Sequence, residues 1–414
     1  MNRWSWLLGR MARQLWVRAS LYGLLGIASA LVAAGVGPFI PAELASRVGA
    51  GSVETILSIV ASSMLTVATF SLGIMVSATG AAASGATPRA SSLLAEDAAA
   101  QSAMSTFLGA FLFSLVGIIG LSAGIYGAGG QLVLFAATLV MIALVVLTLM
   151  HWLHHLTRLG RVGEVIDRVE AVAGRAMAAY AADPLMGCRP LDPEAPLPPG
   201  AVAIECGTIG YLQHVDVAGL AAIAEQNDMD LIVNLRPGAF VTPDRPPAYG
   251  LGPVDDAMAA RIIRCFTIGD ARSFDQDPRF GLVVLAEIAS RALTPAVNDP
   301  GTAIDVLGTL LRVLQPCLAP TIAEPIRPRL AMAAMAPADM LDDAFAPIAR
   351  DGAAMVEVAM RLQKILASLA RSGEPAMAEA ARQQAREAME RALEALPHNG
   401  DRRRLRAERN FTDS

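Results

Sequence analysis

The sequence predicts a membrane protein with four transmembrane α-helices, followed by a cytoplasmic α+β unit and a helical C-terminal region. Hydrophobic residues make up 54% of the 414 residues and charged residues only 17%, a composition unusual for a soluble chain of this length. The first 160 residues contain seven basic and four acidic side chains, whereas the rest of the chain contains 26 basic and 34 acidic ones. This contrast indicates a membrane domain followed by a soluble region large enough to form its own core.

Four apolar segments have the length of membrane-spanning helices, because each is close to or above the roughly 20 residues that cross a bilayer core. The segments are Leu21–Ile40, Thr55–Gly80, Met104–Tyr126 and Gln131–Leu153. The first is longer than the apolar region of a typical signal peptide, and further spans follow it, so we expect it to be retained.

The orientation of the spans follows from the basic residues beside them. With an inside N-terminus, eight arginines flank the spans on the inner side and only Arg47 lies on the outer side. Both termini, and with them the large C-terminal region, are therefore predicted to be cytoplasmic. The inner arginines are Arg3, Arg10, Arg13, Arg18, Arg89, Arg158, Arg161 and Arg168.

Composition and periodicity divide the chain into six regions. Tryptophans beside arginines are typical of an interfacial helix, clustered prolines of a linker, and mixed short strand and helix patterns of an α+β domain. The predicted regions are an interfacial amphipathic helix (1–20), a four-span transmembrane domain (21–158), a helical extension with a Pro-rich linker (159–200), a cytoplasmic α+β domain (201–270), a cytoplasmic helical domain (271–398) and a basic disordered tail (399–414).

The second predicted span contains small and hydroxyl residues at spacings of three or four. At about 100° per residue they fall within one stripe of the helix, which we call the seam. The seam either lines a water-filled path or packs against another helix, and the sequence leaves both readings open. Its residues are Thr55, Ser58, Ser62, Thr66, Thr69, Gly73, Ser77 and Gly80.

No predicted span has an ionisable residue near its middle. Ion-coupled and proton-coupled transporters usually depend on such groups, so the sequence argues against active transport. The remaining possibilities are a passive path across the membrane or no transport path. In the third span, Gly117, Gly120 and Gly124 are predicted to let helices pack closely.

Two Asp-Pro pairs, Asp277-Pro278 and Asp299-Pro300, are typical helix starts, with a capping carboxylate before a proline in the first turn. The turn formed by Asn298, Asp299, Gly301 and Thr302 has two interpretations. Its helix amides bind an anion or a nucleotide phosphate, or the turn is a structural corner in which Asp299 already supplies the negative charge.

No metal or cofactor is predicted. His151, His154 and His155 share a helix face, but no nearby Cys, Asp or Glu completes a site before Glu164, so an interfacial position is favoured.

The four cysteines are far apart and are expected to be reduced structural thiols. Metalloprotease, serine-hydrolase, P-loop and dinucleotide motifs do not occur, and we expect that the chain is not an enzyme.

Four segments carry a resemblance to a known family. Ser62–Val76, Gly207–Asp216, Arg236–Val241 and above all Asp275–Ile304, with the sequence DQDPRFGLVVLAEIASRALTPAVNDPGTAI, resemble the bacterial family called domain of unknown function 2254, a group of predicted membrane proteins. The resemblance covers nearly the whole chain. It implies a multi-span inner-membrane protein with a cytoplasmic C-terminal region, and it supplies no activity, cofactor or catalytic residue.

Two functions remain open at this point. The first is an oligomeric inner-membrane protein that forms a passive channel, lined by the second span and gated or assembled by the cytoplasmic domain. The alternative is a non-transporting, membrane-anchored scaffold or sensor whose cytoplasmic domain binds a partner or ligand. The expected partners are the lipid bilayer and further copies of the chain. We interpret the preference for arginine over lysine as codon bias. No nucleic acid is expected as a partner, and the sequence does not identify a soluble partner.

Overall fold

The computed structural model describes residues 50–408, except 96, 158–159 and 320–324, together with isolated positions between 20 and 35. The described chain forms two compact units. The apolar unit contains the residues up to Ser84 and Ser91–Glu164, and the mixed unit contains Gly85–Ala90 and the residues from Val165 onward. The predicted interfacial helix 1–20 and first span Leu21–Ile40 lie, apart from isolated positions, outside the described residues.

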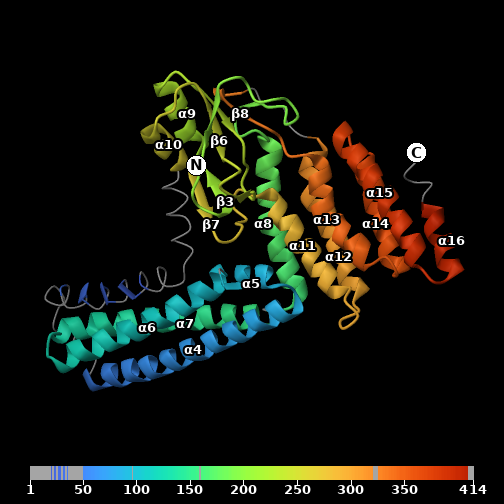
Figure 1. Cartoon of the computed structure of the whole chain (residues 1–414). Helices are drawn as coiled ribbons and strands as arrows, with labels where there is room; N and C mark the ends of the chain where they lie inside the picture. Colours follow the sequence, from blue (N-terminus) through green and yellow to red (C-terminus); the bar gives the residue numbers. More distant parts are fainter. Residues whose placement is uncertain are drawn as a thin grey trace. The chain divides into compact units, whose positions relative to one another are not determined.

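Three long helices build the apolar unit: α4 (Ala50–Gly85), α6 (Ala98–Ser122) and α7 (Ala128–Leu156) (Figure 1). Within the described residues, these are the helices long and apolar enough to cross a bilayer. They correspond to the second, third and fourth predicted spans and are each longer than predicted. The 36 residues of α4 extend about 54 Å at 1.5 Å per residue, well beyond a hydrocarbon core of about 30 Å. A short helix, α5 (Pro88–Ala95), precedes α6.

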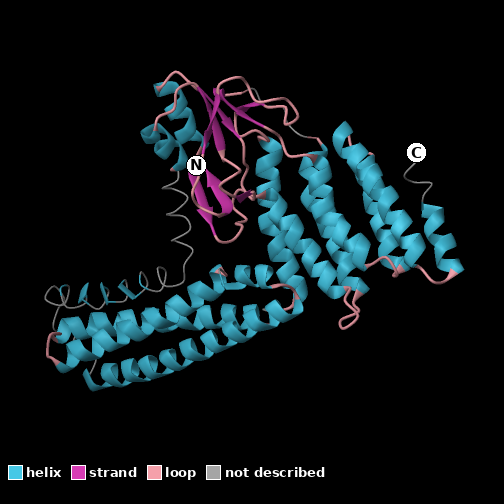
Figure 2. Cartoon of the chain, viewed as in Figure 1, coloured by secondary structure: helices cyan, strands magenta, loops and turns pink. Residues whose placement is uncertain are grey.

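The mixed unit contains two β-sheets beside a group of helices (Figure 2). The larger sheet has the order β1-β8-β4-β6-β2, with β1, β8 and β4 parallel and the remaining pairs antiparallel. The smaller sheet is antiparallel, in the order β5-β3-β7. The strands are β1 (Cys188–Pro190), β2 (Ala201–Ile204), β3 (Gly210–Val215), β4 (Asp230–Val233), β5 (Phe240–Val241), β6 (Ala248–Leu251), β7 (Phe266–Gly269) and β8 (Arg327–Met332).

One hydrophobic core joins the two sheets. Helix α9 (Val217–Gln226) contributes the buried Leu220, which packs in this core with Leu231 of the larger sheet and Leu212 of the smaller one. Helix α10 (Asp256–Ile263) adds Ile262. Each buried aliphatic side chain stabilises the fold by roughly 1.5–3 kcal/mol relative to an exposed one, so this shared core stabilises both sheets.

The helices of the mixed unit pack side by side (Figure 1). Helix α11 contacts α12 and α13, and α15 contacts α13 and α14. Helix α8 approaches α11 so closely at Ala173 that a Cβ at Gly281 would collide with it. The elements are α8 (Val162–Ala182), α11 (Pro278–Ala292), α12 (Pro300–Leu314), the 3-10 helix η2 (Gln315–Leu318), α13 (Pro337–Asp351), α14 (Val356–Ala370), α15 (Pro375–Ala395) and α16 (Asn399–Glu408).

Asp277 joins the helices to the smaller sheet. Its carboxylate accepts two hydrogen bonds from Arg272, at 2.7 and 2.9 Å, and caps α11 by accepting from the amide of Phe280 at 3.1 Å. It also lies against Gly238, whose φ of 93° favours glycine and whose added Cβ would collide with the carboxylate. Asp277 is only 2% exposed, and this burial raises its pKa, which the Arg272 guanidinium offsets in part.

Several predicted boundaries are wrong. Strand β1 lies within the predicted Pro-rich linker, and β8 lies within the predicted helical domain 271–398, so the larger sheet extends beyond 201–270 on both sides. The predicted extension of the last span is the separate helix α8, because the chain turns at Gly160, which has a φ of 83°. The tail predicted to be disordered from 399 forms α16 as far as Glu408, since Leu405 is fully buried against α14 and α15.

Replacing Arg272 with leucine should destabilise the mixed unit, because it leaves the buried Asp277 carboxylate without its cationic partner. We expect a loss of about 3 kcal/mol or more. Hydrogen–deuterium exchange of the full chain in detergent should become faster at the start of α11.

Arg404→Leu is the matched control, since Arg404 forms an exposed pair with Asp401 at 3.6 Å. Such pairs contribute about 0–1 kcal/mol, so this variant should exchange like the unaltered protein. Equal exchange in both variants would show that Asp277 does not need its partner.

Candidate functional site

All eight seam residues lie on α4, and all eight are exposed in the chain. The opposite side of the helix is buried, with Leu57 fully enclosed and Met64 and Met75 less than a tenth exposed. These buried side chains pack against α6 and α7. At about 100° per residue, the centre of the seam is half a turn away from this buried line. Among the described residues, the packing of α4 within the chain therefore does not use the seam.

Four of the six seam hydroxyls, those of Thr55, Ser62, Thr66 and Thr69, donate to carbonyls of their own helix. Thr55 Oγ1 donates to Gly51 at 2.8 Å, Thr66 Oγ1 to Ser62 at 2.9 Å, and Thr69 Oγ1 to Leu65 at 2.8 Å. A hydroxyl has one donor and two acceptor lone pairs. Since the donor is used within the helix, these side chains present acceptors outward.

A hollow of about 590 Å³ lies along the first turns of α4. The described residues around it include Glu54 together with Thr55, Ser58 and Ser62 of the seam. Glu54 is exposed and precedes Ser58 by four residues, which places its carboxylate beside the start of the seam. Glu54 lies one residue before the predicted apolar span Thr55–Gly80 and was therefore not among the predicted site residues, although its four-residue spacing from Ser58 is visible in the sequence.

The three glycines predicted to mediate helix packing have different positions. At Gly117, an added Cβ would lie 3.0 Å from Leu57 of α4 and 3.5 Å from Leu134 of α7, so the three helices meet closely there. Gly120 faces the ring of Tyr126. Gly124 follows the end of α6 in a left-handed turn with a φ of 67°, and it is not part of a helix-packing step.

The histidines near the end of α7 do not converge on one point. His151 and His154 are exposed, whereas His155 Nε2 lies 3.2 Å from the buried carboxylate of Asp97, which caps α6. Nearby, Trp152 Nε1 donates to Ser71 of α4 at 3.0 Å. These polar contacts connect all three helices. Throughout the described residues, no group of three or more His, Cys, Asp or Glu side chains is placed to hold a metal ion.

The turn at residues 298–302 is a tightly bonded corner. Asn298 has a φ of 50°, and Asp299 caps α12 by accepting from the amide of Thr302 at 3.1 Å and from its hydroxyl at 2.7 Å. These bonds, together with one from the Gly301 amide, lower the pKa of Asp299. The amides that an anion would need are therefore occupied by a carboxylate, which favours the structural interpretation.

All four cysteines are free and buried: Cys188, Cys206, Cys265 and Cys317. Burial raises the pKa of Cys188 and of Cys317 to about 11. Since the thiolate is the reactive form, these two thiols are poor nucleophiles at neutral pH.

The described chain thus defines a class of membrane protein in which three long apolar helices precede a mixed α+β region and C-terminal helices. Residues 12–368 match the family described as "Predicted membrane protein (DUF2254)". The chain belongs to this family, as its sequence resemblance indicated.

Two mycobacterial relatives are similar to part of the chain. The uncharacterized protein Rv1290c of Mycobacterium tuberculosis strain H37Rv is 37% identical over 130 residues, which cover 28% of this chain and 24% of that protein. The uncharacterized protein Mb1321c of Mycobacterium bovis has the same identity and coverage. The match spans about a quarter of the length of these relatives, and no solved structure matches the chain.

Replacing Asp299 with alanine should destabilise the mixed unit by about 1 kcal/mol at neutral pH, the usual effect of losing an N-cap. The folded-state pKa of Asp299 is lowered, so its contribution is present above the unfolded pKa of about 3.9 and is lost as the pH falls through the folded value. Urea unfolding followed by circular dichroism gives the free energy of unfolding of Asp299→Ala and of the unaltered protein at pH 7 and at low pH. If the difference between these two free energies grows as the pH falls, the prediction is wrong.

Proposed function

We propose that the protein forms an oligomeric, passive membrane channel in which α4 of each copy turns its seam toward a central path. The supporting observation is that the seam is exposed on the face of α4 opposite its contacts with α6 and α7. A stripe of hydroxyl and small residues facing lipid gains nothing from its polarity, whereas helices of other copies or water would use it. The two termini and the mixed unit lie on the cytoplasmic side of an inner membrane in this proposal.

The chemistry of the seam favours small cations and water over anions. The hydroxyl protons of Thr55, Thr66 and Thr69 are donated to carbonyls of α4, so the outward-facing lone pairs of these side chains act as acceptors. A ring of Glu54 carboxylates at the start of α4 adds negative charge, as at the mouths of cation channels. The absence of a charge along the rest of the seam is consistent with passive flow.

Purified protein in planar bilayers should conduct, with a reversal potential in a KCl gradient displaced toward the potassium equilibrium potential. Thr66→Trp should reduce the conductance at least about tenfold, because it places an indole in a path whose selectivity depends on small hydroxyls. Glu54→Gln should leave the conductance measurable and move the reversal potential toward zero.

Val140→Trp is the control for bulk, because Val140 is exposed on α7 and does not belong to α4. It should conduct like the unaltered protein. Bilayers that stay silent at all voltages and membrane tensions would refute the channel. If Thr66→Trp instead prevents oligomers from forming in size-exclusion chromatography with light scattering, the seam is a packing surface.

A further inference from the structure

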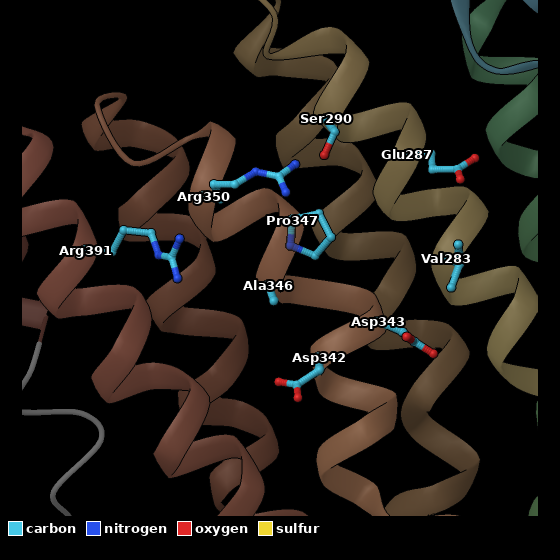
Figure 3. A pocket seen from close by; sticks show the side chains of 9 residues that line it. All are labelled: Val283, Glu287, Ser290, Asp342, Asp343, Ala346, Pro347, Arg350 and Arg391. Carbon is cyan, nitrogen blue, oxygen red and sulfur yellow. The ribbon is translucent and has the colours of Figure 1, made fainter.

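A cleft of about 600 Å³ lies between α11, α13 and α15 in the mixed unit. This volume is within the range of about 300–1,000 Å³ that is usual for small-molecule sites. Its lining combines apolar side chains with both acidic and basic ones (Figure 3). The lining residues are Val283, Glu287, Ser290, Asp342, Asp343, Ala346, Pro347, Arg350 and Arg391.

Most charges around the cleft already have a partner. Asp343 accepts from Arg279 Nε at 2.6 Å, and Arg350 donates to Asp351 at 2.7 and 3.0 Å. Glu287 pairs with Arg89 of the segment Gly85–Ala90, which belongs to the same unit.

Two opposite charges remain available in the cleft. Within the described part of the chain, neither the Asp342 carboxylate nor the Arg391 guanidinium has a hydrogen bond or ion pair. Desolvation and the nearby charges of Glu387, Asp339 and Asp343 raise the pKa of Asp342. A cationic group of a ligand would relieve this repulsion, and an anionic group would suit Arg391.

The backbone of α13 adds a further acceptor. Pro347 lies inside this helix and has no N–H, so the carbonyl of Asp343, four residues earlier, lacks its usual helical donor. Figure 3 shows Ala346 and Pro347 on the same helix as Asp342 and Arg350. The lining of the cleft therefore combines an apolar surface with acceptors and guanidinium groups.

The two charges lie on different helices, Asp342 on α13 and Arg391 on α15. Both side chains are exposed, so a ligand in the cleft can reach them from solvent. A ligand that contacts both charges therefore bridges the two helices.

We propose that this cleft binds a small zwitterion, with its ammonium group at Asp342, its anionic group at Arg391 and its aliphatic part against Ala346, Pro347 and Val283. The site goes beyond the proposed channel and does not depend on it, since it lies wholly within the mixed unit. It would give that unit a ligand-binding role whether or not the protein conducts.

The test uses three soluble probes of equal chain length: 6-aminohexanoate, the dication 1,6-diaminohexane and the dianion adipate. Calorimetric titration of the full chain in nanodiscs should show that 6-aminohexanoate binds at least tenfold more tightly than the other two. Asp342→Asn and Arg391→Gln should each weaken its binding about tenfold, the effect of roughly 1.4 kcal/mol. Glu390→Gln, which removes the neighbouring charge on α15 outside the cleft lining, should leave the affinity unchanged.

Reversal of one charge provides a test by gain of binding, which an unfolded variant cannot mimic. Arg391→Glu should make 1,6-diaminohexane the preferred probe, because the side chains at positions 342 and 391 are then both acidic. Equal affinities for all three probes, or no effect of either charge-removing variant, would overturn the proposal.

A lipid headgroup with an ammonium and a phosphate has the same chemistry as a free zwitterion. Titration in phosphatidylglycerol nanodiscs with and without phosphatidylethanolamine distinguishes these two sources. Competition by phosphatidylethanolamine would identify the headgroup as occupant of the proposed site, and unchanged affinity would identify a soluble zwitterion.

Discussion

The carboxylate of Asp277 connects parts of the mixed unit that are far apart in the sequence. It starts α11, holds Arg272 in the segment after β7, and lies against the left-handed turn at Gly238 before β5. Because this carboxylate is buried, it needs its partners, and a chain that fails to place one of them leaves a charge in a poorly solvated position. The relation of the smaller sheet to the helices, and so the walls of the cleft on α11, depends on this cluster.

The buried polar groups of the apolar unit also need partners, as the Asp277 carboxylate does in the mixed unit. In lipid, a polar group needs a partner from the protein, and the three helices provide it through the contacts of Trp152 with Ser71 and of His155 with Asp97. On the outer face of α4 the partner of each bonded hydroxyl is a carbonyl of the same helix. The buried polar contacts fix the bundle, whereas the exposed ones leave the surface of α4 free to meet other molecules.

Local signals in the sequence predicted local structure well. The apolar lengths identified α4, α6 and α7, and the Asp-Pro pairs located the starts of α11 and α12 to the residue. The seam was recognised from spacing alone, but its direction was not, because periodicity cannot say which face of a helix packs. Strand β1 was missed since it has only three residues, and β8 was missed since its partners β1 and β4 are distant in the sequence. The cleft was invisible because Asp342 and Arg391 lie on helices that approach only in the folded chain.

The order of strands in the larger sheet has a consequence for biosynthesis. Strand β8 lies between β1 and β4, although it is made about 140 residues after β1, which at 5–20 residues per second takes on the order of ten seconds. Until residue 332 leaves the ribosome, β4 has an open edge and β1 has no neighbour in the sheet. Open edges recruit strands from other chains. The nascent protein therefore passes through an interval in which its membrane helices are complete while its sheet still needs protection from neighbouring chains.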